Sequence, residues 1–201
     1  MYSTYCVIHS VHFISFGMQK LSTPRLTLRQ WQDSDTAPFI QMCADEEVMR
    51  YFLKKLNAEE ATAFLQRLKD AIETRGWGLY AVELKATGEF IGFIGLHVHP
   101  PEFEIADAPE IGWRLLPQYW HQGYATEGAK AVLKHAFRNL RLDKVISFTA
   151  SLNTPSERVM QRIGMQKIRE FNHPRVAADH PLNRHVLYEI QRSDYLHIPF
   201  C

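Results

Sequence analysis

Hydrophobic and polar positions change their period several times along the chain, and the first part carries one strand signal followed by helix signals. Apolar and polar residues alternate over residues 25–31 (RLTLRQW), a pattern typical of a half-buried strand. Asp33 or Ser34 then offers an N-cap for a helix that runs to about Cys43. Residues 45–52 read as a further short helix, so we expect two helices after the first strand.

A longer helix follows, and the sequence marks both of its ends. Asn57 is a suitable N-cap, acidic residues occupy the first turn, and Gly76 follows the last turn. The apolar stripe of this helix consists of Ala61, Phe64, Leu65, Leu68 and Ile72. Two β-rich runs come next, residues 77–84 and 89–98, and the turn at 86–88 between them predicts a pair of adjacent strands.

The C-terminal half alternates strands with helices. The predicted elements are a strand over residues 110–116, a helix from a Gly-bearing turn to Phe137, a strand over 144–150, a helix over 154–163, and strands over about 165–171 and 186–192. This order differs from a continuous βαβ series and predicts a mixed α/β fold of the α+β type. We expect one domain over residues 21–197, preceded by an N-terminal extension over residues 1–20.

Composition excludes several functional classes. The 201 residues carry a formal net charge of +1, so no overall field attracts nucleic acid or an anionic membrane. The apolar residues 1–17 lack a basic n-region and contain two histidines, so we expect neither a secretory signal nor a membrane span. The three cysteines, Cys6, Cys43 and Cys201, are too far apart for a CxxC site. We therefore expect free thiols and a cytoplasmic protein.

The turn between the strand at 110–116 and the following helix is the most informative segment. Gly123 allows a backbone conformation and a close approach that a side chain would block. The first N–H groups of a helix lack internal partners and attract anions such as a pyrophosphate, and the small Ala125 leaves room for one. An ordinary tight connection explains the glycine equally well. The sequence contains neither GxGxxG nor GxxxxGK[ST], which argues against dinucleotide and nucleoside triphosphate sites.

The segment EIGWRLLPQYWHQGYATEGAKAVL, with TPRLTLRQW upstream, resembles the GNAT superfamily of N-acetyltransferases, in the RimJ/RimL-like branch. Gly123 and Ala125 match the last two fixed positions of the family pattern Gln/Arg-x-x-Gly-x-Gly/Ala. Trp120 stands at its first position, and His121 stands where glycine is common. The resemblance covers about residues 23–195 and implies a mixed, mostly antiparallel twisted sheet flanked by helices, with splayed central strands.

The resemblance also implies acetyl-CoA as co-substrate and assigns residues to it. The strand before the turn would offer free backbone groups to the pantetheine arm at Trp113, Arg114 and Leu115. The pyrophosphate would lie on backbone amides of the turn, namely those of His121, Gln122, Gly123, Tyr124, Ala125 and Thr126. The side chains of Trp113 and Trp120 are equally readable as core aromatics.

A second motif, SLNTPSERVMQRIGM, lies at the next strand-to-helix turn. From the sequence, Thr154 and Glu157 form a capping box, which leaves Asn153 and Ser156 as surface or capping residues. The resemblance implies more: Asn153 would bind the pantetheine arm, and Ser156 would lie near the thioester sulfur. Many relatives have a tyrosine four residues after this serine as the proton donor, whereas this chain has Met160.

An acceptor amine must lose a proton, and a carboxylate at the start of a strand suits that task. Glu110 resembles a position that some relatives use in this way, although it is also readable as a solvated strand-end acid. His97 and His99 would share one side of a strand, with Glu110 as an imaginable third metal ligand, yet we expect ordinary histidines and no metal. The loop at 173–181 would line the acceptor pocket or form a plain hairpin loop.

We therefore expect an N-acetyltransferase that passes an acetyl group to a primary amine, either a protein N-terminus or a small molecule, by direct attack in a ternary complex. Ser156 and Glu110 are the candidate catalytic residues. No nucleic-acid or membrane partner is expected, and a homodimer is possible. An acyl-CoA-binding sensor without catalysis is the alternative, because Met160 replaces the usual proton donor.

Overall fold

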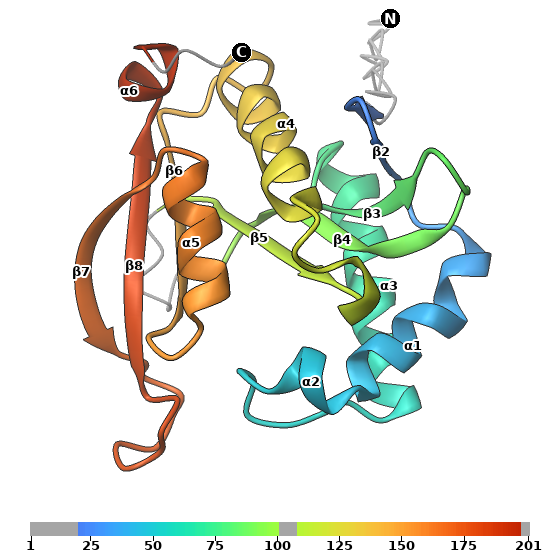
Figure 1. Ribbon diagram of the computed structural model, residues 1–201, viewed down its shortest axis with the longest axis horizontal. Coiled ribbons are helices and arrows are strands. Elements are labelled where there is room, and N and C mark those ends of the chain that lie inside the picture. The colour runs from blue at the N-terminus through green and yellow to red at the C-terminus, as the bar shows by residue number, and fades with distance from the viewer. Residues whose placement is uncertain (1–19, 101–107, 198–201) are drawn as a thin grey trace, which may run out of the picture.

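The computed structural model describes residues 20–100 and 108–197, which form one open eight-stranded sheet covered by helices (Figure 1). The strand order is β1-β2-β3-β4-β5-β6-β8-β7, and only β5 and β6 are parallel neighbours. The strands are β1 (Leu21–Ser22), β2 (Leu26–Arg29), β3 (Leu79–Leu84), β4 (Phe90–His97), β5 (Glu110–Leu115), β6 (Lys144–Ala150), β7 (Gln166–Asn172) and β8 (Arg184–Gln191). The predicted mixed, mostly antiparallel sheet is confirmed.

Six α-helices and two 3₁₀ turns lie within the described residues. They are η1 (Asp33–Asp35), α1 (Thr36–Ala44), α2 (Glu46–Met49), α3 (Ala58–Arg75), η2 (Pro117–Tyr119), α4 (Tyr124–Arg138), α5 (Thr154–Arg162) and α6 (Arg192–His197). The longest predicted helix begins and ends as expected, because Asn57 accepts a hydrogen bond from the Glu60 N–H and Gly76 closes the helix with φ +77°. None of the described helices is long and apolar enough to cross a membrane.

Consecutive residues of β4 separate the two faces of the sheet, as the period of a strand requires. The ring of Phe93 packs against Phe39 of α1 and Phe64 of α3. Its neighbour Ile94 faces α4, so closely that a Cβ on Gly128 would come within 2.4 Å of its side chain. Helices α1 and α3 therefore cover one face of this part of the sheet, and α4 covers the other.

Strands β5 and β6 separate almost as soon as they meet. Their ladder has a single register pair, Glu110 with Ile146, whereas β5 pairs with β4 along its whole length. In Figure 1, β5 runs away from β6 toward the η2 turn. The splayed central strands implied by the family resemblance are confirmed. Beyond this pair the Ser147 hydroxyl of β6 still donates to the Ile111 carbonyl at 2.9 Å, and no further backbone register pair joins β5 to β6.

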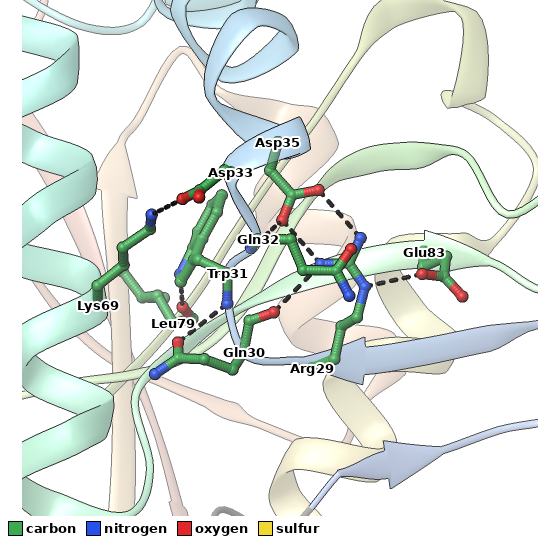
Figure 2. A network of polar contacts seen from close by, with 9 residues as sticks. All are labelled: Arg29, Gln30, Trp31, Gln32, Asp33, Asp35, Lys69, Leu79 and Glu83. Atoms are coloured by element: carbon green, nitrogen blue, oxygen red, sulfur yellow. Dashed lines mark hydrogen bonds and ion pairs between the residues drawn. The ribbon is translucent and has the colours of Figure 1, made fainter.

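A buried ionic network fixes the chain where β2 gives way to α1 (Figure 2). The Arg29 guanidinium donates to both carboxylate oxygens of Asp35, at 2.7 and 3.0 Å, and to Glu83 at 2.7 Å. The hydrogen bond with Asp35 is the main reason that the pKa of Arg29 is raised, and burial opposes it. The Asp35 side chain is only 2% exposed. Asp35 cannot stay buried without this partner, so the pair sets the start of α1.

The N-terminal boundaries of the first helices were predicted imperfectly. Neither Asp33 nor Ser34 caps α1; a 3₁₀ turn occupies residues 33–35 instead. Asp35 binds Arg29 rather than capping the helix, because a buried guanidinium is a stronger partner than a solvated helix end. Strand β1 and helix α6 were not anticipated, while the order of the other elements is as predicted. The predicted extension lies almost wholly outside the described residues.

Candidate active site

The turn that enters α4 has the geometry of an anion site. His121 has φ +60° and Gly123 has φ +81°, both in the left-handed region. The first hydrogen bond of the helix runs from the Glu127 N–H to the Gly123 carbonyl at 3.0 Å. The N–H groups of Tyr124, Ala125 and Thr126 precede it and therefore have no acceptor within the helix. They lie at the positive end of a 15-residue helix.

Arg25 holds this turn in place, although no motif in the sequence indicated such a role. Its guanidinium donates to the Gln122 carbonyl at 2.9 Å and to the Glu127 carboxylate at 2.6 Å. The same group lies 4.4 Å from the centre of the Tyr124 ring. Burial raises the pKa of Glu127, but hydrogen bonds from Thr23 and Arg25 outweigh it, so the pKa is lowered overall. The residues involved are about a hundred positions apart in the chain, so no local pattern relates them.

The aromatic and apolar residues of this segment mainly support the fold. The Trp120 indole N–H donates to the Leu115 carbonyl at 2.7 Å, which ties the turn to the end of β5. The side chains of Trp113 and Trp120 both pack against the main core, and Leu115 and Tyr124 are buried within it. These four residues can therefore contribute to a ligand site chiefly through their backbone, whereas His121, Gln122 and Gly123 are exposed.

The second motif lies beside the gap between the strands, at the end of β6. Asn153 is the N-cap of α5: its Oδ1 accepts the Ser156 N–H at 3.4 Å, and its Nδ2 donates to Thr149 Oγ1 at 2.9 Å. The predicted capping box of Thr154 and Glu157 was wrong, since Thr154 is already the first residue of the helix and Asn153 is its cap. Ser156 is partly exposed in the first turn of α5.

The side chains of Glu157 and Met160 make contacts that support the fold. The Glu157 carboxylate accepts a hydrogen bond from the Tyr188 hydroxyl at 2.8 Å. Glu157 takes no part in a capping box, because with Asn153 as the N-cap the third helical position is Ser156. Met160 is 1% exposed and belongs to the core. The residue at the position of the usual tyrosine therefore packs inward, and it carries no exchangeable proton.

Glu110 lies where β5 and β6 last touch. One carboxylate oxygen is 2.5 Å from His99 Nε2, and the side chains of Glu110 and His99 are 17% and 16% exposed. Burial raises the pKa of Glu110, while hydrogen bonds from His99 and from the Phe148 backbone partly offset the shift. A carboxylate with a raised pKa is a stronger base than a solvated one, and His99 orients it.

Histidine and phenylalanine rings surround this carboxylate. The His97 and His99 rings lie 4.7 Å apart, and His99 lies 5.4 Å from Phe148. On the neighbouring strands, the His173 and His185 rings lie 4.8 Å apart. Burial lowers the pKa of His97 to about 4 and also lowers those of His173 and His185. In the part of the chain that the structure describes, no three His, Cys, Asp or Glu side chains are placed to hold a metal ion.

The structure thus brings the two motifs to the two sides of one gap. The first motif runs along β5 and through the turn at residues 121–126, called here the anion turn. Asn153 and Ser156 of the second motif follow β6, the neighbouring strand of the sheet. Helices α4 and α5, which begin at the two motifs, contact one another. A turn with the geometry of an anion site, a largely unpaired strand edge and a mostly buried carboxylate therefore lie in sequence along β5.

Comparison with known proteins gives this arrangement a family. A model described as an acetyltransferase (GNAT) domain matches residues 25–166. An uncharacterized N-acetyltransferase of Bacillus subtilis (strain 168), YoaA, is 30% identical over 149 residues, which cover 73% of this chain and 82% of that protein. A GNAT-family acetyltransferase structure from Bacillus anthracis has a TM-score of 0.74 at 27% identity, covering 87% of this chain and 99% of that chain.

A more distant structure has the same fold. Mycobacterium smegmatis RimJ, in complex with CoA-disulfide, has a TM-score of 0.68 at 19% identity and covers 90% of this chain and 88% of that chain. At this identity the likeness concerns the fold alone, while the family model and YoaA concern the sequence itself. The chain therefore belongs to the GNAT acetyltransferase family and is an N-acetyltransferase.

Proposed function

We propose that this enzyme transfers an acetyl group from acetyl-CoA to a primary amine by direct attack in a ternary complex. The observation that carries the proposal is the open edge of β5, which joins the anion turn at one end to Glu110 at the other. The acceptor is a protein N-terminus or a small-molecule amine.

The anion turn fits the pyrophosphate of acetyl-CoA. The free N–H groups at the start of α4 and the exposed turn at residues 121–123 provide donors without a competing carboxylate, since Glu127 is already bound by Arg25. The backbone of Trp113, Arg114 and Leu115 would accompany the pantetheine arm along the gap, with Asn153 on its other side. Acetyl-CoA supplies the activated acetyl thioester. The CoA derivative bound to RimJ, which has the same fold, supports this assignment.

Glu110 acts as the base that takes the proton from the acceptor amine. A free α-amino group has a pKa near 8, so about a tenth of it is neutral at pH 7, and a modest base suffices. Burial makes Glu110 a better proton acceptor than an exposed glutamate, and its contact with His99 offers a path for the proton toward the surrounding histidines.

Ser156 stabilises the departing sulfur. Its hydroxyl lies in the first turn of α5, where the helix field favours negative charge. Because Met160 cannot donate a proton, the hydroxyl of Ser156, or a water that it holds, is the donor left at this turn. Positioning of the two substrates supplies most of the remaining rate.

Labelled acetyl-CoA added to cell lysate with the purified enzyme tests the proposal, because mass spectrometry then identifies every acetylated amine. Glu110→Gln serves as the matched variant, since it keeps the shape of the side chain and removes its basicity. We expect amine products that depend on the enzyme and fall by at least about a hundredfold in the variant. Products that are unchanged in the variant would remove Glu110 from the mechanism, and transfer to hydroxyl or thiol groups alone would refute the acceptor class.

A further inference from the structure

Positions 110, 112 and 114 share one face of β5, because alternate residues of a strand point the same way, so Glu110 and Arg114 project their side chains on either side of Gly112. Arg114 is opposite Phe93 in the β4–β5 ladder, and Phe93 lies on the face that α1 and α3 cover. A Cβ placed on Gly112 would meet no atom of the described residues within 4 Å. The face therefore presents a carboxylate, an open space and a guanidinium in turn.

The surroundings of the Arg114 guanidinium are apolar. It lies 4.1 Å from the centre of the Phe52 ring and 5.2 Å from that of Phe93. Its Nε is buried and has no hydrogen-bond partner among the described residues. Over residues 20–100 and 108–197, its one polar side-chain contact is that of Nη1 with Cys43 Sγ at 3.7 Å.

None of these described neighbours balances the charge. Burial raises the pKa of the Cys43 thiol, so the sulfur is neutral at physiological pH. No carboxylate among the described residues contributes to the electrostatic surroundings of Arg114, and burial lowers its pKa. By contrast, the buried Arg29 holds two carboxylates. Aromatic faces attract a cation but accept no ordinary hydrogen bond, so the guanidinium still requires an acceptor.

The position of this group links it to the acceptor amine. Arg114 lies on the same face as the proposed base and four residues from it, roughly 13 Å along the strand. Phe52, which covers it, is 46% exposed, so the guanidinium is near the surface. One guanidinium matches the single charge of a carboxylate in a bidentate geometry, whereas a phosphate monoester carries about −1.5 to −2 and would need a second cation.

Resting on the proposed N-acetyltransfer, we propose that Arg114 is a specificity-determining residue that binds a carboxylate on the acceptor, so that the acceptor is a primary amine carrying a carboxylate. The carboxylate belongs either to a free amino acid or to an acidic side chain near a peptide N-terminus. The backbone of Arg114 keeps its place beside the pantetheine arm, and the side chain faces the acceptor.

Matched acceptor pairs test this inference with the full chain and acetyl-CoA. One arm compares amino acids with their carboxamides, and the other compares peptides that have Glu or Gln at the second or third position. We expect kcat/KM to favour the carboxylate member by at least about tenfold in one arm, mostly through KM. Arg114→Met should abolish that preference, and Arg114→Lys should retain part of it because the charge remains.

Arg67→Met is the control, since Arg67 is an exposed arginine that lies 5.6 Å from a phenylalanine ring on α3. It should leave the ratio unchanged. Melting temperature and acetyl-CoA affinity, measured for every variant, show whether Arg114→Met is folded. Should Arg114→Met fail to fold, the comparison rests on Arg114→Lys and on the wild-type ratio.

The outcomes separate this inference from the proposed function. Equal kcat/KM for both members of every pair, with turnover intact, overturns the carboxylate site and leaves N-acetyltransfer standing. If no amine is acetylated, saturation-transfer NMR on the CoA-loaded protein compares binding of the same pairs. Binding that favours the carboxylate and is lost in Arg114→Met would then support the site while the proposed reaction fails. Equal or absent binding would overturn both.

Discussion

Gly123→Val should weaken both the fold of the anion turn and its affinity for acetyl-CoA. Gly123 has φ +81°, a conformation that costs about 1–2 kcal/mol for a residue with a Cβ and more for a β-branched one. Space within the protein is not the limit, because a Cβ there would meet only Arg25 Nη2 among the described atoms, at an ordinary 3.5 Å. The cost therefore comes from the backbone and from the ligand that must approach it.

The expected magnitudes follow from this geometry. For valine, a loss of about 2 kcal/mol or more lowers Tm by roughly 4–8 °C or more in a chain of this size. Acetyl-CoA affinity should fall further, by about 1–3 kcal/mol, because the turn amides are displaced and the valine occupies the approach to them. That loss is roughly fivefold to 150-fold in Kd.

Calorimetry with acetyl-CoA and thermal unfolding of the free protein measure the two effects separately. His121→Gly is the matched control from the same turn, since His121 has φ +60° and carries a side chain. Glycine removes that strain but adds about 0.5–1 kcal/mol of chain entropy, so we expect a net gain in stability of up to about 1 kcal/mol. A Gly123→Val protein that binds acetyl-CoA as tightly as the wild type would refute the assignment of the turn to the pyrophosphate.

Three further predictions concern catalysis and stability. Ser156→Ala should lower kcat by about tenfold to a hundredfold and leave acetyl-CoA affinity unchanged; an unchanged kcat with a confirmed acceptor would return Ser156 to a surface role. The raised pKa of Glu110 means that the folded protein binds the proton more tightly than the unfolded chain, so stability falls as pH rises through the pKa. Glu110→Gln should therefore be more stable than the wild type at pH 7 by about 1–3 kcal/mol, the usual cost of a buried polar group that is incompletely satisfied. The difference in stability should narrow as pH falls toward about 4. Thermal melts across pH that show the opposite trend would contradict the burial argument. Arg29→Met should lower the free energy of unfolding, measured with denaturant, by about 3–5 kcal/mol, because the Asp35 carboxylate stays buried without its partner. The double variant Arg29→Met with Asp35→Leu should recover much of that loss. A double variant as unstable as the single one would contradict this account.

The sequence by itself determined the features that depend on neighbouring residues. Helix α3 was delimited correctly because Asn57 and Gly76 act through local backbone geometry. The tight turn before α4 was predicted from Gly123, and its φ of +81° is in the left-handed region that glycine adopts readily. The order of strands and helices followed from changes in hydrophobic period, and the family resemblance supplied the splayed strands.

Local patterns were insufficient where more than one arrangement of hydrogen bonds is available to the same segment. Thr154 and Asn153 are both good caps, and the actual choice depends on the course of the chain after β6, which lets Asn153 reach both Thr149 and the Ser156 N–H. Asp35 was likewise available as a helix cap, but the buried guanidinium of Arg29 took it. In both cases an interaction that is stronger in the folded protein overrode the local preference.

Only the tertiary structure decided which distant groups share a site. Arg25 clamps the anion turn although it precedes Glu127 by about a hundred residues, and His99 meets Glu110 because β4 and β5 pair in one register. Above all, the lack of a carboxylate partner for Arg114 among residues 20–100 and 108–197 is a property of its three-dimensional surroundings. In sequence Arg114 is one arginine among many, and it becomes exceptional only when the fold places two phenylalanine rings and a neutral thiol around it. Burial and pairing are set by contacts between segments that are remote in the chain, so they are decided when the sheet and its helices assemble.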